Sequence, residues 1–289
     1  MLFSVLLSLY HKESPLFLRQ SLTSIFTQTL LPIEVVLVED GPLTDELYAV
    51  IKEFTSQHPE LKVISLPTNR GLGKALNEGL KHCSYDLVAR MDTDDIAKPD
   101  RFEKQLAIFL EHPEIDVVGG AIEEVDENSE SRDKVIVYPK GPKECYEFFS
   151  RRNPHAHPAV LFRKSFFEKL ENPNANLNPK VRLAYKSENR RWYRPEYRQN
   201  QDTMLWLDGM SKGTNHANIP DVILRFRFTN SLFKKRRNGW TFAKKQLADR
   251  KMINKALGYG FGATIFGYMM FIMLVSPAWV KKIVYKLFR

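Results

Sequence analysis

The chain has 289 residues, enough for one large domain or two small ones, and its 43% hydrophobic and 12% aromatic content is ample for a buried core. Its two cysteines, Cys83 and Cys145, exclude a disulfide framework and a cysteine-rich metal site, and favour a reducing compartment. The net charge of +9 is uneven, with +12 in residues 231–289 and −3 in residues 1–230, which argues against a nucleic-acid-binding face on the body.

The first 120 residues are predicted to alternate strands and helices. The apolar run at the start is too short for a signal peptide and has no basic lead-in, so it is interpreted as a buried strand. Short apolar strands separated by helices predict an α/β fold with a mostly parallel, Rossmann-like sheet and helices on both faces. The predicted strands are 3–9, 34–38, 61–66, 85–90 and one beginning at 117; the predicted helices are 16–26, 44–54 (capped by Thr44), 72–80 and 99–110.

The second half is less regular. Residues 123–133 are predicted to be a polar connection, 202–210 a helix and 222–228 a strand, with polar loops at 172–178 and 187–198. This half is expected to contact the more variable substrate.

The C-terminal tail is basic and apolar. Residues 234–237 are all Lys or Arg, and Ala256–Val280 has no charged side chain. As one helix this stretch would measure roughly 37 Å, enough for a ~30 Å hydrocarbon core, but its glycines and Pro277 disfavour a straight span. Lysines on both sides favour a membrane-associated re-entrant hairpin or interfacial helix pair. A buried C-terminal helix and a spanning helix are the alternatives.

Acidic residues crowd the end of the predicted strand 85–90. Asp92, Asp94 and Asp95 follow it with no apolar spacer, and like charges at this spacing repel unless something neutralises them. Mg²⁺ and Mn²⁺ prefer oxygen ligands and suit this role. A turn rich in helix-capping Asp before Pro99 is the alternative.

Polar side chains also follow the first two predicted strands. Tyr10 and Glu13 follow the first, and Asp40 follows the second, while Arg70 near a helix start can meet phosphate. Ligands of open α/β sheets bind at the carboxyl ends of the strands, so we expect these groups to lie together. An aromatic ring, a lone acid and a metal-binding cluster suit a nucleoside diphosphate.

These motifs, in this order, resemble those of family 2 glycosyltransferases of the GT-A fold, which include bacterial enzymes of capsule, exopolysaccharide and lipopolysaccharide assembly. The resemblance covers residues 2–228. The matching residues are Ser8-Leu9-Tyr10 with Glu13; residues 21–29; Val36 to Gly41; Asn69-Arg70-Gly71 with Ala75, Asn77 and Gly79; Asp92 to Asp95; His157 to Val160; and Gln201-Asp202 with Leu205-Trp206-Leu207.

The resemblance implies a domain organisation and an activity. Residues 1–230 would form the GT-A domain, with a nucleotide-sugar half at about 1–120 and an acceptor half at about 121–230, and residues 231–289 the membrane-associated tail. The expected reaction is metal-dependent and inverting, from a nucleoside-diphosphate sugar (UDP-sugar first) to a glycan or polyprenyl-linked acceptor in surface polysaccharide assembly. The expected location is the cytoplasmic face of a bacterial inner membrane, with no nucleic-acid partner.

The resemblance also implies residue roles. Asp202 would be the general base, and Asp92 and Asp94 would form the Asp-x-Asp pair that holds Mn²⁺ or Mg²⁺, with Asp95 able to replace either. The base usually follows a Glu, but here it follows Gln201. Tyr10, Glu13, Asp40, Arg70 and Asp92 would bind the nucleotide sugar.

Several alternatives remain at the level of sequence. Processive synthases carry Gln-x-x-Arg-Trp after the base, whereas Arg190-Arg191-Trp192 lies before Asp202 and lacks the Gln, so addition of a single sugar is expected. Gln201 favours the alternative of a non-catalytic, membrane-bound nucleotide-binding scaffold. Asp202 can instead be an N-cap. His155 and His157 flank the predicted acceptor region; a structural role is the favoured interpretation, and contact with phosphate or the acceptor is the alternative. A nucleotidyltransferase would need a Gly-rich loop after the first strand, which is absent.

Overall fold

The computed structural model describes residues 1–172, 192–228 and 240–276. The rest of the predicted polar loops (173–178 and 187–191, with Arg190 and Arg191), the basic run 234–237 and the end of the tail from Pro277 lie outside the described residues. Within the described residues, one sheet has the strand order β3-β2-β1-β4-β8-β6-β9-β5, and β7 pairs with β6.

The first half of the sheet is parallel, as predicted. The strands β1 (Phe3–Leu9), β2 (Glu34–Glu39), β3 (Leu61–Ser65) and β4 (Leu87–Arg90) pair in this way, and the connecting helices are α1 (Pro15–Phe26), α2 (Asp45–Gln57) and α3 (Leu72–His82). Thr44 caps α2, since its hydroxyl accepts a hydrogen bond from the Leu47 amide at 3.4 Å. The carboxyl ends of β1, β2 and β4 therefore meet at one edge.

Antiparallel pairing enters beyond β4. The strand β8 (Leu161–Arg163) is antiparallel to both β4 and β6 (Val117–Val125), while β9 (His216–Arg227) is parallel to β6 and antiparallel to β5 (Ile96–Ala97). The prediction of a polar connection at 123–133 was wrong, since this stretch holds the end of β6 and the start of β7 (Ser131–Ile136). Polar side chains are tolerated there because the two strands pair near the margin of the sheet.

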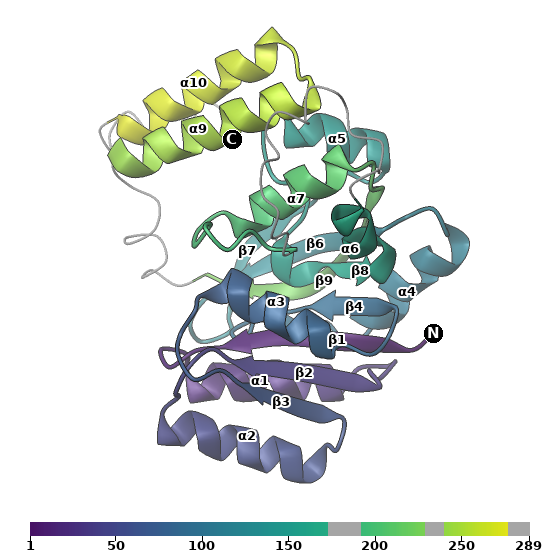
Figure 1. The fold of residues 1–289 in the computed structure, drawn as a ribbon. Coiled ribbons are helices and arrows are strands. Elements are labelled where there is room, and N and C mark those ends of the chain that lie inside the picture. Colours follow the sequence, from purple (N-terminus) through teal and green to yellow (C-terminus); the bar gives the residue numbers. More distant parts are fainter. Residues whose placement is uncertain (173–191, 229–239, 277–289) are drawn as a thin grey trace.

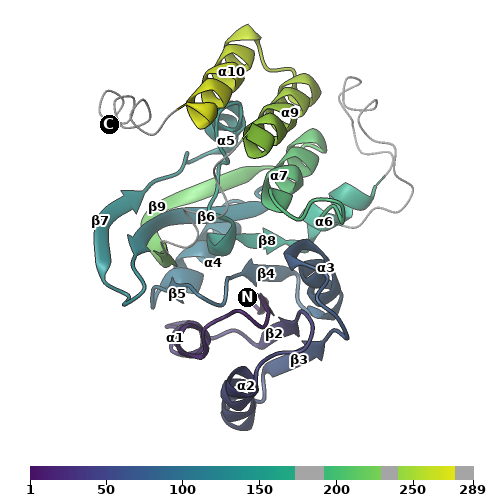
Figure 2. The same cartoon turned by 90° about the vertical axis from the view of Figure 1, so that its left-hand side faces the viewer.

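Helices cover both faces of the sheet (Figure 2). One core packs Val35 and Leu37 of β2 against α1, α2 and α4 (Arg101–Glu111). The other packs the alternate residues Val36 and Val38 against α3, and it extends to α6 (Lys164–Glu171) and α7 (Gln201–Ser211). Burial on both faces explains why the first strands are continuous apolar runs.

The tail forms a helical hairpin at the end of the molecule opposite α2 (Figure 1). Its arms are α9 (Trp240–Leu257) and α10 (Phe261–Val275), and α9 packs on α7. The turn is fixed to α5 (Pro142–Phe149), because the Tyr146 hydroxyl donates to the Leu257 carbonyl and the Tyr259 hydroxyl donates to the Tyr146 carbonyl. The described part of the uncharged stretch, residues 256–276, thus contributes mainly the second arm, and the first arm is charged.

In the part of the chain that is described, no helix combines the length and the apolar character needed to cross a membrane.

Candidate active site

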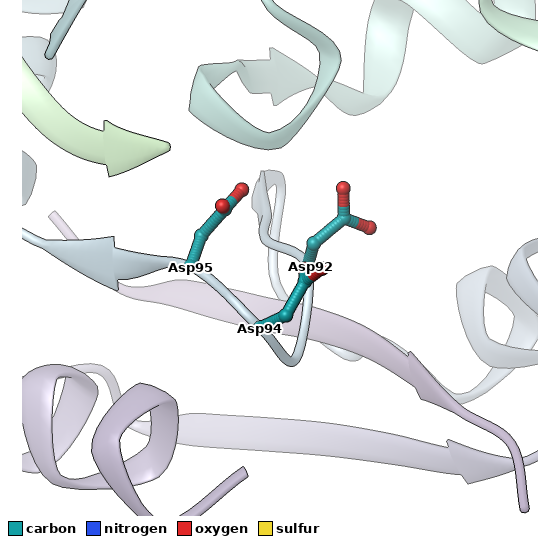
Figure 3. A group of neighbouring side chains, drawn as sticks. All are labelled: Asp92, Asp94 and Asp95. Atoms are coloured by element: carbon teal, nitrogen blue, oxygen red, sulfur yellow. The ribbon is translucent and has the colours of Figure 1, made fainter. Parts of the chain in front are cut away.

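The aspartates after β4 gather into one cluster. Ligand-type oxygen atoms of Asp92, Asp94 and Asp95 all lie within 4.8 Å of one another. Asp92 and Asp95 project to the same side of the loop, on either side of the turn that carries Asp94 (Figure 3). Burial, the Asp92 charge and the Glu13 charge raise the pKa of Asp94 to about 8. Repulsion between these carboxylates and their burial therefore disfavour the ionised form of Asp94.

The donor set fits a divalent metal ion. Asp95 is fully buried; its Oδ1 accepts from the Arg227 amide at 2.8 Å, and its Oδ2 has no partner among the described residues. A buried carboxylate oxygen without a partner is costly, and carboxylates are the oxygen ligands that Mg²⁺ and Mn²⁺ favour. Asp92 and Asp94 could hold such an ion from the more exposed side of the loop, with Asp95 beneath.

Arg90 is a site residue that the sequence prediction missed. It is the last residue of β4 and is 2% exposed, and its Nη2 forms an ion pair with Asp92 Oδ1. Its Nε and Nη1 have no hydrogen-bond partner among the described residues. A basic residue inside an apolar strand, two positions before an acidic cluster, was the signal available in the sequence.

Arg227 fixes the other side of the aspartate loop and was also missed. Its Nε donates to the Asp94 carbonyl at 2.8 Å and its Nη2 donates to Gln20 Oε1 at 2.7 Å, while its guanidinium stacks 4.0 Å from the Phe17 ring centroid. The end of β9 thereby holds the aspartate loop against α1. The residues that Arg227 contacts are distant from it in sequence, so no local sequence pattern predicts these contacts.

Glu13 and Tyr10 lie at the end of β1, as predicted. Glu13 Oε2 accepts from the Thr93 hydroxyl at 3.0 Å and its Oε1 accepts from the Ser14 amide at 2.8 Å. Burial raises the pKa of Glu13, and the Asp92 charge adds to this. Tyr10 is partly buried, and its ring contacts that of His11 at 5.9 Å between centroids. The hydrogen bond between Glu13 and Thr93 thus joins the loop after β1 to the loop after β4, which carries the aspartates.

Asp40 holds the loop that carries Arg70. Its two carboxylate oxygens accept from the Arg70 amide at 2.6 Å and the Gly71 amide at 2.9 Å. The loop comes so close that a Cβ on Gly41, which has φ +89°, would lie 2.5 Å from the Asn69 nitrogen, so only glycine fits there. Each oxygen of Asp40 keeps a lone pair for a further donor, so this role is compatible with the predicted contact to a nucleotide base.

Asp202 lies in the first turn of α7, and Asn200 holds the N-cap position, so Asp202 is not the cap. Its Oδ2 accepts from Asn153 Nδ2 at 3.0 Å, and burial raises its pKa although the Arg90 charge opposes the shift. A Cβ on Gly73 would lie 3.6 Å from the Gln201 Cβ, so the start of α3 adjoins the start of α7. The start of α7, which carries Asp202, thus adjoins the start of α3, which follows the Arg70 loop.

Tyr193 connects the two sides of this edge. It is fully buried, its amide donates to Asn77 Oδ1 at 2.8 Å, and its hydroxyl lies 2.7 Å from His157 Nε2. Burial raises the pKa of Tyr193, and the negative charges of Asp202 and Asp92 both contribute to the increase. The charges of Asp202 and Asp92 thus both act on this one buried side chain.

His155 belongs to a buried hydrogen-bonded chain outside this site. Asn218 donates its amide hydrogens to two backbone carbonyls, so its Oδ1 accepts from His155 Nδ1 at 2.8 Å. His155 Nε2 then accepts from His216 Nδ1 at 3.0 Å, and His216 Nε2 accepts from the Thr214 hydroxyl at 2.8 Å. Burial lowers the pKa of His155 to about 4, so the ring is neutral and structural at pH 7.

Known proteins resemble this chain over most of its length. Residues 4–171 match the family model described as glycosyl transferase family 2. The amylovoran biosynthesis glycosyltransferase AmsE of Erwinia amylovora is 39% identical over 267 residues, which cover 92% of this chain and 91% of that protein. A UDP-Gal:alpha-D-GlcNAc-diphosphoundecaprenol beta-1,3-galactosyltransferase of Escherichia coli is 32% identical over 271 residues, which cover 94% and 87%.

The fold is also shared with solved structures. The crystal structure of S. aureus TarS 1–349 in complex with UDP-GlcNAc matches with a TM-score of 0.64 at 16% identity, covering 95% of this chain and 74% of that one. At this identity the likeness shows the fold alone, which is the GT-A fold expected from the motifs. Because the family model spans more than half of the residues and relatives above 30% identity span nearly all of them, this chain belongs to glycosyl transferase family 2.

Proposed function

We propose that the protein transfers one sugar from a UDP-sugar, with inversion at the anomeric carbon, to a glycan or lipid-linked acceptor in bacterial surface polysaccharide assembly. The proposal is supported by the ring of side chains at the carboxyl ends of β1, β2 and β4, and by the start of α7, which carries Asp202 and adjoins the start of α3. The E. coli relative is named for a UDP-galactose donor and a diphosphoundecaprenol-linked acceptor, which supports this class of substrates.

The donor is assigned to the side of the ring formed by β1, β2 and the Arg70 loop. Asp40 fixes that loop and retains acceptor capacity for a base N–H, and Tyr10 offers an aromatic face. Arg70 would neutralise phosphate charge as the nucleoside diphosphate departs. Glu13 positions Thr93 between the aspartates through the 3.0 Å hydrogen bond to its hydroxyl.

Mn²⁺ or Mg²⁺ is proposed at Asp92 and Asp94, with Asp95 as the supporting carboxylate. When bound, such an ion neutralises the developing charge on the leaving diphosphate. Arg90 pairs with Asp92 Oδ1, which restricts the orientation of this carboxylate and leaves Oδ2 for the ion. Among the described residues, no other Lys or Arg side chain forms an ion pair with a carboxylate of this cluster, and Arg227 reaches Asp95 through its backbone amide.

Asp202 is proposed to accept the proton of the attacking hydroxyl. Its elevated pKa makes it a better proton acceptor, and Asn153 fixes one carboxylate oxygen. Inversion needs no enzyme nucleophile, so a single displacement suffices. Non-processive addition is proposed because the Gln-x-x-Arg-Trp pattern is absent after Asp202.

The test uses the full-length protein with Mn²⁺, a panel of UDP-sugars and a GlcNAc-diphosphate lipid. Asp202→Asn is expected to reduce transfer by roughly 10²- to 10⁴-fold, the usual contribution of a general base, with little change in donor affinity. The matched control is Asp221→Asn, which removes a half-exposed carboxylate on β9 that pairs with Lys104 at 2.5 Å. Wild-type turnover in the Asp202 variant would remove the base assignment.

A non-catalytic nucleotide-binding scaffold is the second candidate, and Gln201 in place of the usual Glu is the feature that favours it. Wild-type protein that binds UDP with Mn²⁺ but neither transfers nor hydrolyses any donor in the panel would support the scaffold and contradict the enzyme.

A further inference from the structure

The outer side of α10 exposes a continuous apolar surface. The helix packs on α9 with its inner side, where Gly267 is buried against Leu247 and Arg250. Its outer residues recur at helical spacing, so they share one face. The exposed fractions are 79% for Phe261, 44% for Ile265, 45% for Tyr268, 56% for Met269 and 60% for Ile272.

Lysines of α9 border this surface. Lys244, Lys251 and Lys255 are exposed at positions that lie on one side of the helix. The Lys251 ammonium lies 4.7 Å from the Tyr268 ring centroid, so the basic row adjoins the apolar face of α10. At the other end of the hairpin, Trp240 is 56% exposed, and its ring centroid lies 5.2 Å from that of Phe271. The Lys244 ammonium lies 5.3 Å from the Trp240 ring centroid.

The hairpin surface carries no acidic side chain. Within the described residues 240–276 the sequence has one acid, Asp249, which is 5% exposed and accepts from Asn200 Nδ2 at 2.9 Å. The sequence before and after the hairpin adds further Lys and Arg, giving residues 231–289 a net charge of +12.

We propose that this surface, the outer face of α10 with the lysine row of α9, docks on an anionic lipid bilayer. Aromatic and aliphatic side chains enter the boundary between headgroups and acyl chains, and the lysines meet lipid phosphates at its edge. A second copy of the chain is disfavoured as the occupant, because it would bring another strongly basic surface against this one. This inference builds on the proposed lipid-linked acceptor and names the surface that brings the enzyme to it.

Docking would also orient the active site. Asn200, which holds Asp249 of α9, stands two residues before Asp202, and α9 packs along α7. The hairpin and the proposed base are therefore fixed to one another, so a bilayer under α10 presents lipid-linked acceptors to Asp202 at a constant distance.

The test is flotation of full-length protein with phosphatidylcholine vesicles, with or without 30% phosphatidylglycerol. Binding to the anionic vesicles is expected, with weakening at 0.5 M salt because charge attraction is screened. Replacing Lys244, Lys251 and Lys255 together by Gln is expected to lower the affinity on the order of 10²-fold, at about tenfold or less per lysine. Replacing Ile265, Met269 and Ile272 by Ser is expected to lower it at least about tenfold.

Matched controls are Leu110→Ser on α4, where the side chain is 64% exposed, and Lys52→Gln on α2, which is also exposed. Both should bind as wild type does. Equal vesicle binding by the wild type and both hairpin variants would overturn the proposal. It would also be overturned if light scattering showed that the wild type forms a dimer and that the α10 variant does not. UDP binding should be unchanged in every variant. Vesicle binding without sugar transfer would refute the proposed function and leave this inference standing.

Discussion

Arg90 shows how much a single buried residue determines at this site. Its guanidinium is 2% exposed and lies beside Asp92, and its charge also favours ionisation of Asp94 and Asp202. Arg90 is buried but Asp92 is 30% exposed, so removing the guanidinium leaves a partly buried carboxylate uncompensated, which costs more than breaking an exposed pair. The aspartate loop thus depends on a cation supplied by the strand beneath it.

We predict that Arg90→Gln lowers the free energy of unfolding by on the order of 1–3 kcal/mol without added metal, because the Asp92 carboxylate left behind is partly buried. The control is Arg19→Gln, which breaks an ion pair with Glu53 whose side chains are 44% and 39% exposed; it should leave the free energy of unfolding nearly unchanged, because solvent screens an exposed pair. Urea denaturation followed by circular dichroism measures both. Similar costs for the two variants would show that Arg90 does not support the aspartate cluster.

At the scale of secondary-structure elements, Glu34 joins the parallel strands at the edge opposite the site. Its carboxylate accepts from the Ser4 hydroxyl of β1 at 2.6 Å, from the Lys62 ammonium of β3 at 2.6 Å and from the Ser84 amide before β4 at 2.8 Å. Burial raises the pKa of Glu34, but these hydrogen bonds outweigh it and lower the pKa to about 2. Glu34 therefore ties the start of β2 to β1, to β3 and to the segment before β4.

The depressed pKa of Glu34 gives a pH-dependent stability. The contribution is complete above the ordinary value of 4.5 and is lost as the pH falls towards 2, since the unfolded chain then binds the proton more readily. Glu34→Gln should lower the stability at pH 7 by on the order of 2–3 kcal/mol and flatten its decline between pH 5 and pH 3.

Urea midpoints measured across this range check the prediction. Glu53→Gln, in the exposed pair with Arg19, serves as the control and should keep the wild-type slope. An unchanged slope in Glu34→Gln would mean that other carboxylates carry the acid sensitivity.

At the scale of the whole molecule, the parallel half followed from the sequence and the mixed half did not. Apolar runs between short helices predict parallel strands whose carboxyl ends share an edge, and this correctly placed Glu13, Asp40 and Asp92 at that edge. The strand Leu161–Arg163 is too short for a period to show, so its antiparallel position beside β4 was not predictable.

The missed site residues have a common physical reason. Arg227 contacts Gln20 and Asp94, which are far from it in sequence, and only the closed sheet brings them together. Arg90 was visible in the sequence, but its burial was not. The tail shows the same limit: the uncharged stretch was recognisable, whereas Gly258, with φ +71°, divides the tail into a charged arm and an apolar one.

The central claim is that carboxylates from separate strands, together with a divalent cation, hold a nucleoside diphosphate at one edge of the sheet. Isothermal titration of UDP into wild-type protein with Mn²⁺, into the same protein with EDTA, and into Asp94→Asn with Mn²⁺ tests it most directly. Tight binding is predicted only in the first case, and at least roughly tenfold weaker binding in the other two, where a tenfold change is 1.4 kcal/mol. Equal UDP affinity in all three titrations would contradict it.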